Sequence, residues 1–168
     1  LFTELKNKML HIPNTDYNFL YDSIVSYGEK ISTTIVSEYL NACGVKNKLV
    51  SAVDLIKTDN NYRDANVNWE LTKVNVRQAL EPIFSFVDMV ITQGFIGGTK
   101  ENLAVTLGRE GSDYSAAILA HCMGSKSMTI WKDVPGLLNA DPKRVEKTTK
   151  LSSIPRVLPF IASPKMPS

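Results

Sequence analysis

The length and charge of the chain exclude several kinds of protein. It has 168 residues, 43% of them hydrophobic and 21% charged, with a formal net charge of +2 at pH 7. This favours a single globular domain, and the balanced charge without a basic cluster argues against a nucleic-acid partner. No apolar run approaches the roughly 20 residues that span a bilayer, so no membrane partner is expected. Cys43 and Cys122 follow no ligand or disulfide spacing, which indicates a reducing compartment.

Hydrophobic spacing predicts helices in the first half of the chain. Apolar residues recur every three or four positions from Leu1 to Leu10 and again from Asp16 to Leu40, where Gly44 would end the second helix. Gly28 should weaken this helix by about 1 kcal/mol, unless it marks a close approach of another group. A third helix is predicted from Trp69 to about Leu80, capped by the asparagine before it.

Three β-rich apolar runs predict buried strands, at Lys48–Val53, Asp88–Thr92 and Ser127–Trp131. A hairpin is predicted around the polar tip Lys100–Asn102. The alternation of strands and helices predicts an α/β fold with a mostly parallel sheet flanked by helices on both faces. Ligands bind such sheets at the carboxyl ends of the strands, which is where Gln93–Gly98 lies.

A glycine-punctuated turn precedes the last predicted helix. The stretch is Thr106-Leu-Gly-Arg-Glu-Gly-Ser-Asp-Tyr-Ser-Ala-Ala117, and the helix is expected from Tyr114 to Met123. Ser112 or Asp113 is the predicted N-cap, because its side-chain oxygen can accept from free amides of the first turn.

The same turn is a candidate anion site. Gly108 and Gly111 allow the backbone to bend sharply and to approach a ligand closely. Free amides at a helix N-terminus bind anions, and the guanidinium of Arg109 beside them suits a carboxylate or a phosphate. Spacing alone also fits an ordinary capped helix with a solvated Arg109.

Four ordered blocks of the sequence resemble aspartate kinase, of the amino-acid kinase superfamily. They are Thr92-Gln-Gly-Phe-Ile-Gly97, the glycine turn Thr106–Ala117, Ile130-Trp-Lys-Asp-Val-Pro-Gly136 and Ala140-Asp-Pro142. The resemblance implies a truncated three-layer α/β sandwich, with residues 1–151 as a partial catalytic domain and 152–168 as an irregular proline-rich tail. The family's opening Lys-Phe-Gly-Gly-Thr-Ser is not in this sequence, so a fragment with little or no kinase activity by itself is expected. Parents with and without a fused homoserine dehydrogenase both fit.

The resemblance implies transfer of the ATP γ-phosphoryl group, with Mg²⁺, to the side-chain carboxylate of L-aspartate. This is a cytoplasmic step of lysine, threonine and methionine biosynthesis, and the parent is expected to be a homo-oligomer. Glu29 would hold the amino group of the substrate, and Arg109 its α-carboxylate with Ser112 beside it. Phe95 would form a wall of the pocket, and Asp113 would orient a catalytic lysine. By pattern alone, Glu29 is an ordinary solvated helix residue.

The nucleotide residues implied by the resemblance come later in the chain. They are Lys132, Asp133, Leu138 and Lys143. The family usually has threonine, tyrosine and arginine in place of Lys132, Leu138 and Lys143. Glu110 replaces the usual glycine or asparagine of the turn and adds negative charge near a phosphate. No residue pattern indicates a metal site.

Two other functions remain open from the sequence. One is an amino-acid kinase acting on glutamate, N-acetylglutamate or a nucleotide. The other is a non-catalytic ligand-binding or assembly module with the same fold. A nicotinamide-dependent dehydrogenase is disfavoured, because no Gly-x-Gly-x-x-Gly follows a predicted strand.

Overall fold

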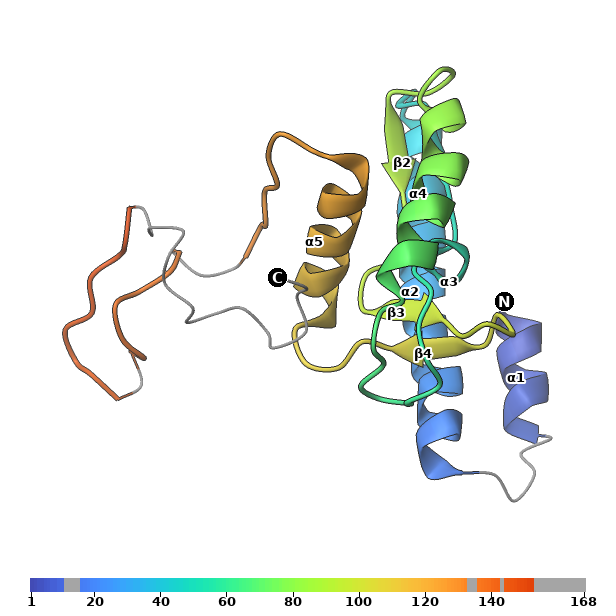
Figure 1. Ribbon diagram of the computed structural model, residues 1–168, viewed down its shortest axis with the longest axis horizontal. Coiled ribbons are helices and arrows are strands. Elements are labelled where there is room, and N and C mark those ends of the chain that lie inside the picture. Colours follow the sequence, from blue (N-terminus) through green and yellow to red (C-terminus); the bar gives the residue numbers. More distant parts are fainter. Residues whose placement is uncertain (11–15, 133–135, 143, 153–168) are drawn as a thin grey trace. The chain divides into compact units, whose positions relative to one another are not determined.

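The computed structural model describes residues 1–10, 16–132, 136–142 and 144–152. The chain divides into two compact units, residues 1–128 and 129–168, and each is described by itself. The helices and strands of the described residues all lie in the first unit (Figure 1). They are α1 (Phe2–Leu10), α2 (Tyr17–Ala42), β1 (Asn47–Leu49), α3 (Ala52–Leu55), α4 (Trp69–Ile83), β2 (Met89–Ile91), β3 (Ile96–Gly98), β4 (Ala104–Thr106) and α5 (Gly111–Met123). None of these described helices is both long and apolar enough to cross a membrane.

The three helices predicted in the first half of the chain are confirmed as α1, α2 and α4. The side chain of Asp16 caps α2 by accepting from the backbone N–H of Asn18 at 3.1 Å. Gly44, with a φ of +82°, follows the end of α2 in the left-handed conformation that glycine adopts without strain. Among the described residues no other group approaches Gly28, because a Cβ built there would meet nothing within 4 Å.

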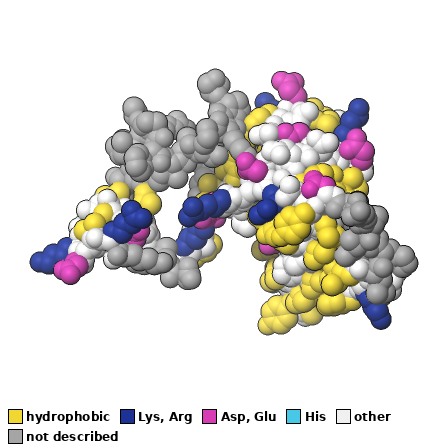
Figure 2. All heavy atoms as spheres, turned by 90° about the horizontal axis from the view of Figure 1, so that it is seen from below, with side chains coloured by type: hydrophobic (Ala, Val, Ile, Leu, Met, Phe, Trp, Pro, Cys, Tyr) yellow, Lys and Arg dark blue, Asp and Glu magenta, His cyan; other side chains and the backbone are white. Residues whose placement is uncertain are grey.

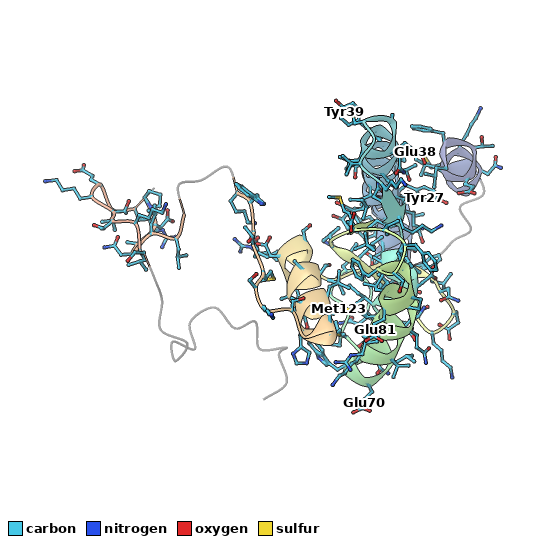
Figure 3. All side chains as sticks on the ribbon, turned by 90° about the horizontal axis from the view of Figure 1, so that it is seen from above. Tyr27, Glu38, Tyr39, Glu70, Glu81 and Met123 are labelled. Atoms are coloured by element: carbon cyan, nitrogen blue, oxygen red, sulfur yellow. The ribbon has the colours of Figure 1, made fainter. Side chains whose placement is uncertain are left out.

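The apolar stripe of α2 is only partly buried. The apolar residues have the spacing of a helix, yet the relative exposures of Ile35 and Tyr39 are 62% and 68%. Figure 3 shows Tyr39 pointing away from the rest of the unit, and Figure 2 shows several hydrophobic side chains exposed together on one of its faces. The buried residues of α2 are mostly small and polar, and Tyr27 is the one aromatic residue among them: Asp22, Ser23, Ser26, Tyr27 and Ser37.

The strands form one parallel pair and one antiparallel hairpin. β1 and β2 are parallel, with Lys48 opposite Val90, and β3 and β4 are antiparallel, with Gly97 opposite Val105. A single parallel bridge at Gly98 connects β3 to the segment after α3. The predicted hairpin is therefore confirmed. The first predicted strand is shorter than expected, because the chain turns into α3 after it.

The predicted strand at Ser127–Trp131 is not present. The structure has no strand in this stretch, and its side chains are exposed, that of Trp131 to 92%. A β-strand needs a neighbouring strand for its backbone hydrogen bonds, so β-rich composition alone does not produce one.

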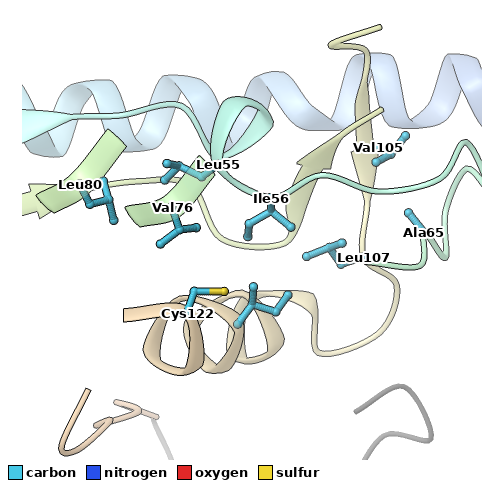
Figure 4. Close-up of a cluster of buried hydrophobic side chains, with 9 residues drawn as sticks. Leu55, Ile56, Ala65, Val76, Leu80, Val105, Leu107 and Cys122 are labelled. Atoms are coloured by element: carbon cyan, nitrogen blue, oxygen red, sulfur yellow. The ribbon is translucent and has the colours of Figure 1, made fainter. Parts of the chain in front are cut away.

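The main hydrophobic core anchors α5. Its nine buried residues come from the segments around α3, α4, β4 and α5 (Figure 4). They are Leu55, Ile56, Ala65, Val76, Leu80, Val105, Leu107, Ile118 and Cys122. α4 and α5 pack against each other, and the Nε of Arg77 donates to the carbonyl of Cys122 at 2.9 Å. This packing fixes the axis of α5 and therefore the place of its N-terminus.

Candidate functional site

The glycine turn leads into α5 one turn earlier than predicted. The helix begins at Gly111, and its N-cap is Glu110, in the left-handed conformation with φ 56° and ψ 26°. The predicted N-caps Ser112 and Asp113 are therefore wrong, since both lie inside the first turn. The reason is the tight bend at Gly108, whose φ is +79° and whose carbonyl accepts from the N–H of Gly111 at 3.2 Å.

The start of α5 lies directly against the segment that follows β2. A Cβ added to Gly111 would lie 2.6 Å from Cδ2 of Phe95, and one added to Gly94 would lie 3.1 Å from the Cα of Ser112. The backbone N–H of Phe95 donates to Oγ of Ser115 at 3.0 Å. These contacts bring two predicted substrate residues, Phe95 and Ser112, together. Phe95 itself has a φ of +69°, a strained conformation of the kind often found at ligand sites.

Glu29 is connected to the same segment through Gln93. The hydroxyl of Thr33 donates to the backbone carbonyl of Glu29 at 2.7 Å and accepts from Nε2 of Gln93 at 2.9 Å. Oε1 of Gln93 accepts from the backbone N–H of Ala52 at 2.8 Å. Gln93 is only 4% exposed, and it therefore ties α2 and α3 to the residues just before Phe95.

The environment of Glu29 also changes its acidity. Its side chain is half-buried, and the loss of water around the carboxyl raises its pKa above the usual value of 4.5. A carboxylate partly removed from water interacts more strongly with a cation than a fully solvated one.

Arg109 and Ser112 face solvent at the N-terminal end of α5. Within the described residues, the guanidinium of Arg109 forms no hydrogen bond or ion pair with another side chain. A cation and a hydroxyl thus stand beside the positive end of a helix, where an anion is stabilised. Asp113 is half-buried in the first turn of the same helix.

The predicted nucleotide residues belong to the second unit. Lys132 is exposed, whereas Leu138 is half-buried and forms an isolated antiparallel bridge with Lys150. Asp133 and Lys143 lie outside the described residues. In the described part of the chain, no group of three or more His, Cys, Asp or Glu side chains is placed to hold a metal ion.

Two residues that connect these elements were not recognised in the sequence as important. Gln93 lies within the block Thr92–Gly97 that resembles aspartate kinase, but nothing in its spacing indicates a buried amide that bridges two helices. Asp22 on α2 is fully buried and accepts hydrogen bonds from Thr106, which lies 84 positions later in the chain.

The profile of the Amino acid kinase family matches residues 3–157. The chain belongs to this family. It is 34% identical over 132 residues to the bifunctional aspartokinase/homoserine dehydrogenase of Buchnera aphidicola, covering 78% of this chain and 16% of the relative. It is also 34% identical over 136 residues to the lysine-sensitive aspartokinase 3 of Escherichia coli, covering 80% of this chain and 30% of that protein.

Solved structures agree with this assignment to the amino acid kinase family. The structure of E. coli aspartokinase III in complex with aspartate and ADP matches with a TM-score of 0.81 and 30% sequence identity, covering 89% of this chain and 33% of that chain. This confirms the predicted resemblance and the truncated α/β fold class. The chain spans about a third or less of the length of these relatives.

Proposed function

We propose that this amino acid kinase chain is part of an aspartate kinase, which transfers the γ-phosphoryl group of ATP to the β-carboxylate of L-aspartate. The observation that carries the proposal is the junction at the start of α5, where Gly111 lies against Phe95 and Gly94 lies against Ser112, directly after the turn that carries Arg109. The similarity to aspartokinases, one of them solved with aspartate and ADP, supports the same substrates.

In this proposal the substrate is held by its head group. The guanidinium of Arg109 pairs with the α-carboxylate through two parallel hydrogen bonds, with Ser112 and the free amides of α5 beside it. The carboxylate of Glu29 pairs with the α-ammonium group, and the Phe95 ring limits the pocket. With the α-carboxylate and the α-ammonium group both held, only the distal carboxylate of aspartate remains free to reach phosphorus.

The chemical step then needs little from the protein besides alignment and charge. An oxygen of the β-carboxylate forms a bond to the γ-phosphorus, the bond from that phosphorus to the bridging oxygen breaks, and ADP leaves. The attacking carboxylate is already an anion, so no general base is required. Asp113 orients a lysine that stabilises the transferred group, as the family resemblance implies.

The remaining assignments concern the nucleotide and the parent protein. Lys132, Asp133, Leu138 and Lys143 contact ATP, which arrives with Mg²⁺. Residues 1–151 form the partial catalytic domain, and 152–168 form the tail. The parent is a cytoplasmic homo-oligomer that acts in lysine, threonine and methionine biosynthesis.

Calorimetric titration of the 168-residue chain with L-aspartate tests the proposed grip. Arg109→Ala should weaken binding by roughly ten- to a hundredfold, the range expected for a lost charge-assisted pair. Lys126→Ala is the matched control, because it removes the same charge from an exposed position outside the site. N-acetyl-L-aspartate should not bind, since it lacks the ammonium group that Glu29 holds. Equal heats for wild type and Arg109→Ala would remove Arg109 from the site.

A further inference from the structure

Asp22 is a buried carboxylate that the proposed mechanism does not use. It lies on α2 with no exposed surface. Its Oδ2 accepts from the backbone N–H groups of Arg63 and Thr106, both at 2.8 Å, and its Oδ1 accepts from the Thr106 hydroxyl at 2.9 Å. A charge is costly to bury unless it is well hydrogen-bonded, and three converging donors meet that requirement.

These hydrogen bonds join three parts of the chain at one point. Asp22 comes from α2, Arg63 from the loop before α4, and Thr106 from the end of β4. The loop and the strand are also bonded directly, because the N–H of Ala65 donates to the carbonyl of Thr106 at 3.1 Å. The glycine turn rests on the same loop, since a Cβ on Gly108 would approach a carboxylate oxygen of Asp64 to 2.5 Å and the carbonyl oxygen of Arg63 to 3.5 Å.

A second contact holds the loop against α2. The guanidinium of Arg63 lies over the ring of Tyr21, with its Cζ 4.8 Å from the ring centroid, and more distantly over Tyr17. This cation–π contact and the Asp22 hydrogen bond act on the same loop residue, from its side chain and from its backbone. The loop is therefore fixed to α2, and through Arg63 and Asp64 it also contacts the glycine turn at Gly108.

Asp22 joins the two parts of the chain that carry the predicted substrate residues Glu29 and Arg109. Glu29 lies two helical turns further along α2, roughly 10 Å away and near the same face. Arg109 lies three positions after Thr106, in the glycine turn, which contacts Asp64. The carboxylate thus connects the helix that carries Glu29 with the turn that carries Arg109.

We propose that Asp22 is a positioning residue whose carboxylate sets the spacing between Glu29 and Arg109, and hence the fit of an α-amino acid head group. The inference rests on the proposed function, because it takes these two residues to hold the ammonium and the α-carboxylate. Asp22 itself does not touch the substrate. Its removal leaves the buried N–H of Thr106 and the part-buried N–H of Arg63 without their acceptor, and the turn moves to satisfy them.

Three variants of the 168-residue chain test this. Asp22→Ala removes the whole junction, and Thr106→Val removes only the hydroxyl bond while keeping the shape of the side chain. Ser37→Ala is the matched control on the same helix, because the Ser37 hydroxyl is buried and donates to Oδ1 of Asn47 at 2.6 Å, far along α2 from the junction. Each variant is titrated with L-aspartate in the calorimeter after its folding has been checked by circular dichroism.

The expected pattern separates positioning from general stability. Asp22→Ala should weaken aspartate binding at least about tenfold and Thr106→Val about threefold, since a displacement near 1 Å is enough to disturb a binding geometry. Ser37→Ala should bind as wild type does, although it also loses a buried hydrogen bond. Unchanged affinity in Thr106→Val and in folded Asp22→Ala, or an equal loss in Ser37→Ala, would overturn the inference. If Asp22→Ala does not fold, Thr106→Val decides alone.

Hydrogen exchange provides a readout that does not depend on aspartate. In Asp22→Ala the amides of Arg63 and Thr106, and those of the turn up to Gly111, should exchange faster than in Ser37→Ala. Unaltered exchange at these amides would also overturn the inference. If wild type itself shows no heat with aspartate, the proposed function fails instead, and the exchange result still shows whether Asp22 fixes the turn.

Discussion

Replacing Gly111 with alanine tests whether the close contact between α5 and Phe95 holds the site together. The added Cβ would lie 2.6 Å from Cδ2, 3.1 Å from Cα and 3.3 Å from the carbonyl oxygen of Phe95. Phe95 cannot easily retreat, because its N–H is bonded to Ser115 Oγ and its carbonyl accepts from the N–H of Leu107 at 2.8 Å. Either α5 or the Phe95 segment must therefore shift.

Two opposing terms set the size of the effect. Alanine in a helix is favoured over glycine by at most about 1 kcal/mol. Forcing a methyl group into a packed site costs about 1–3 kcal/mol. We therefore expect Gly111→Ala to lower the free energy of unfolding by up to about 2 kcal/mol, which for a chain of this size lowers the melting temperature by up to roughly 8 °C.

Gly28→Ala is the natural control, because Gly28 also lies in a helix but has no group of the described chain within 4 Å of its Cβ position. This change should raise the free energy of unfolding by about 0.5–1 kcal/mol. Urea unfolding of the two variants and wild type, followed by circular dichroism, measures both effects. The packing argument is refuted if Gly111→Ala is as stable as Gly28→Ala, whatever the stability of wild type.

Two further predictions concern ionisable groups. Because burial raises the pKa of Glu29, its carboxyl takes up a proton at a higher pH than an ordinary glutamate, and the neutral form cannot pair with an ammonium group. As the pH is lowered from neutral, the affinity of wild type for aspartate should begin to fall at a higher pH than an ordinary glutamate would give. Glu29→Gln should bind aspartate weakly, and its affinity should depend less on pH. The same dependence of affinity on pH in wild type and Glu29→Gln would contradict this. Burial also raises the pKa of the Cys122 thiol, whereas Cys43 is exposed, so a thiol reagent should label Cys43 alone in the folded chain and both cysteines in urea. Mass spectrometry identifies the labelled site. Rapid labelling of Cys122 without denaturant would contradict its burial in the hydrophobic core.

Several features followed from local sequence because their causes are local. The spacing of apolar residues predicted α1, α2 and α4, and the polar tip Lys100–Asn102 predicted the hairpin of β3 and β4. The glycines of the turn before α5 predicted a sharp bend, which is present at Gly108, whereas the group that approaches Gly111 closely is Phe95 of the same chain. Glycine has no Cβ, so its role in such a bend can be inferred without knowing the partner.

Other features could not be inferred because they depend on a distant partner. The apolar residues Ile35 and Tyr39 have helical spacing, but spacing does not tell which face of a helix is covered. The β-rich run ending at Trp131 has no strand beside it in the described residues, and without one its backbone does not adopt β structure. The N-cap of α5 moved to Glu110 because the bend at Gly108 and packing on Phe95 determine where the helix starts.

By itself, the sequence determined the kinds of secondary structure, the glycine turn and the family to which the chain belongs. Only the tertiary structure decided which groups meet: Phe95 with the start of α5, Gln93 with Thr33, and Asp22 with Thr106. The physical reason is the range of the interactions. Periodicity and backbone conformation act over a few neighbouring residues, whereas a buried carboxylate is satisfied by donors 41 and 84 positions away, and nothing in the local pattern marks those donors.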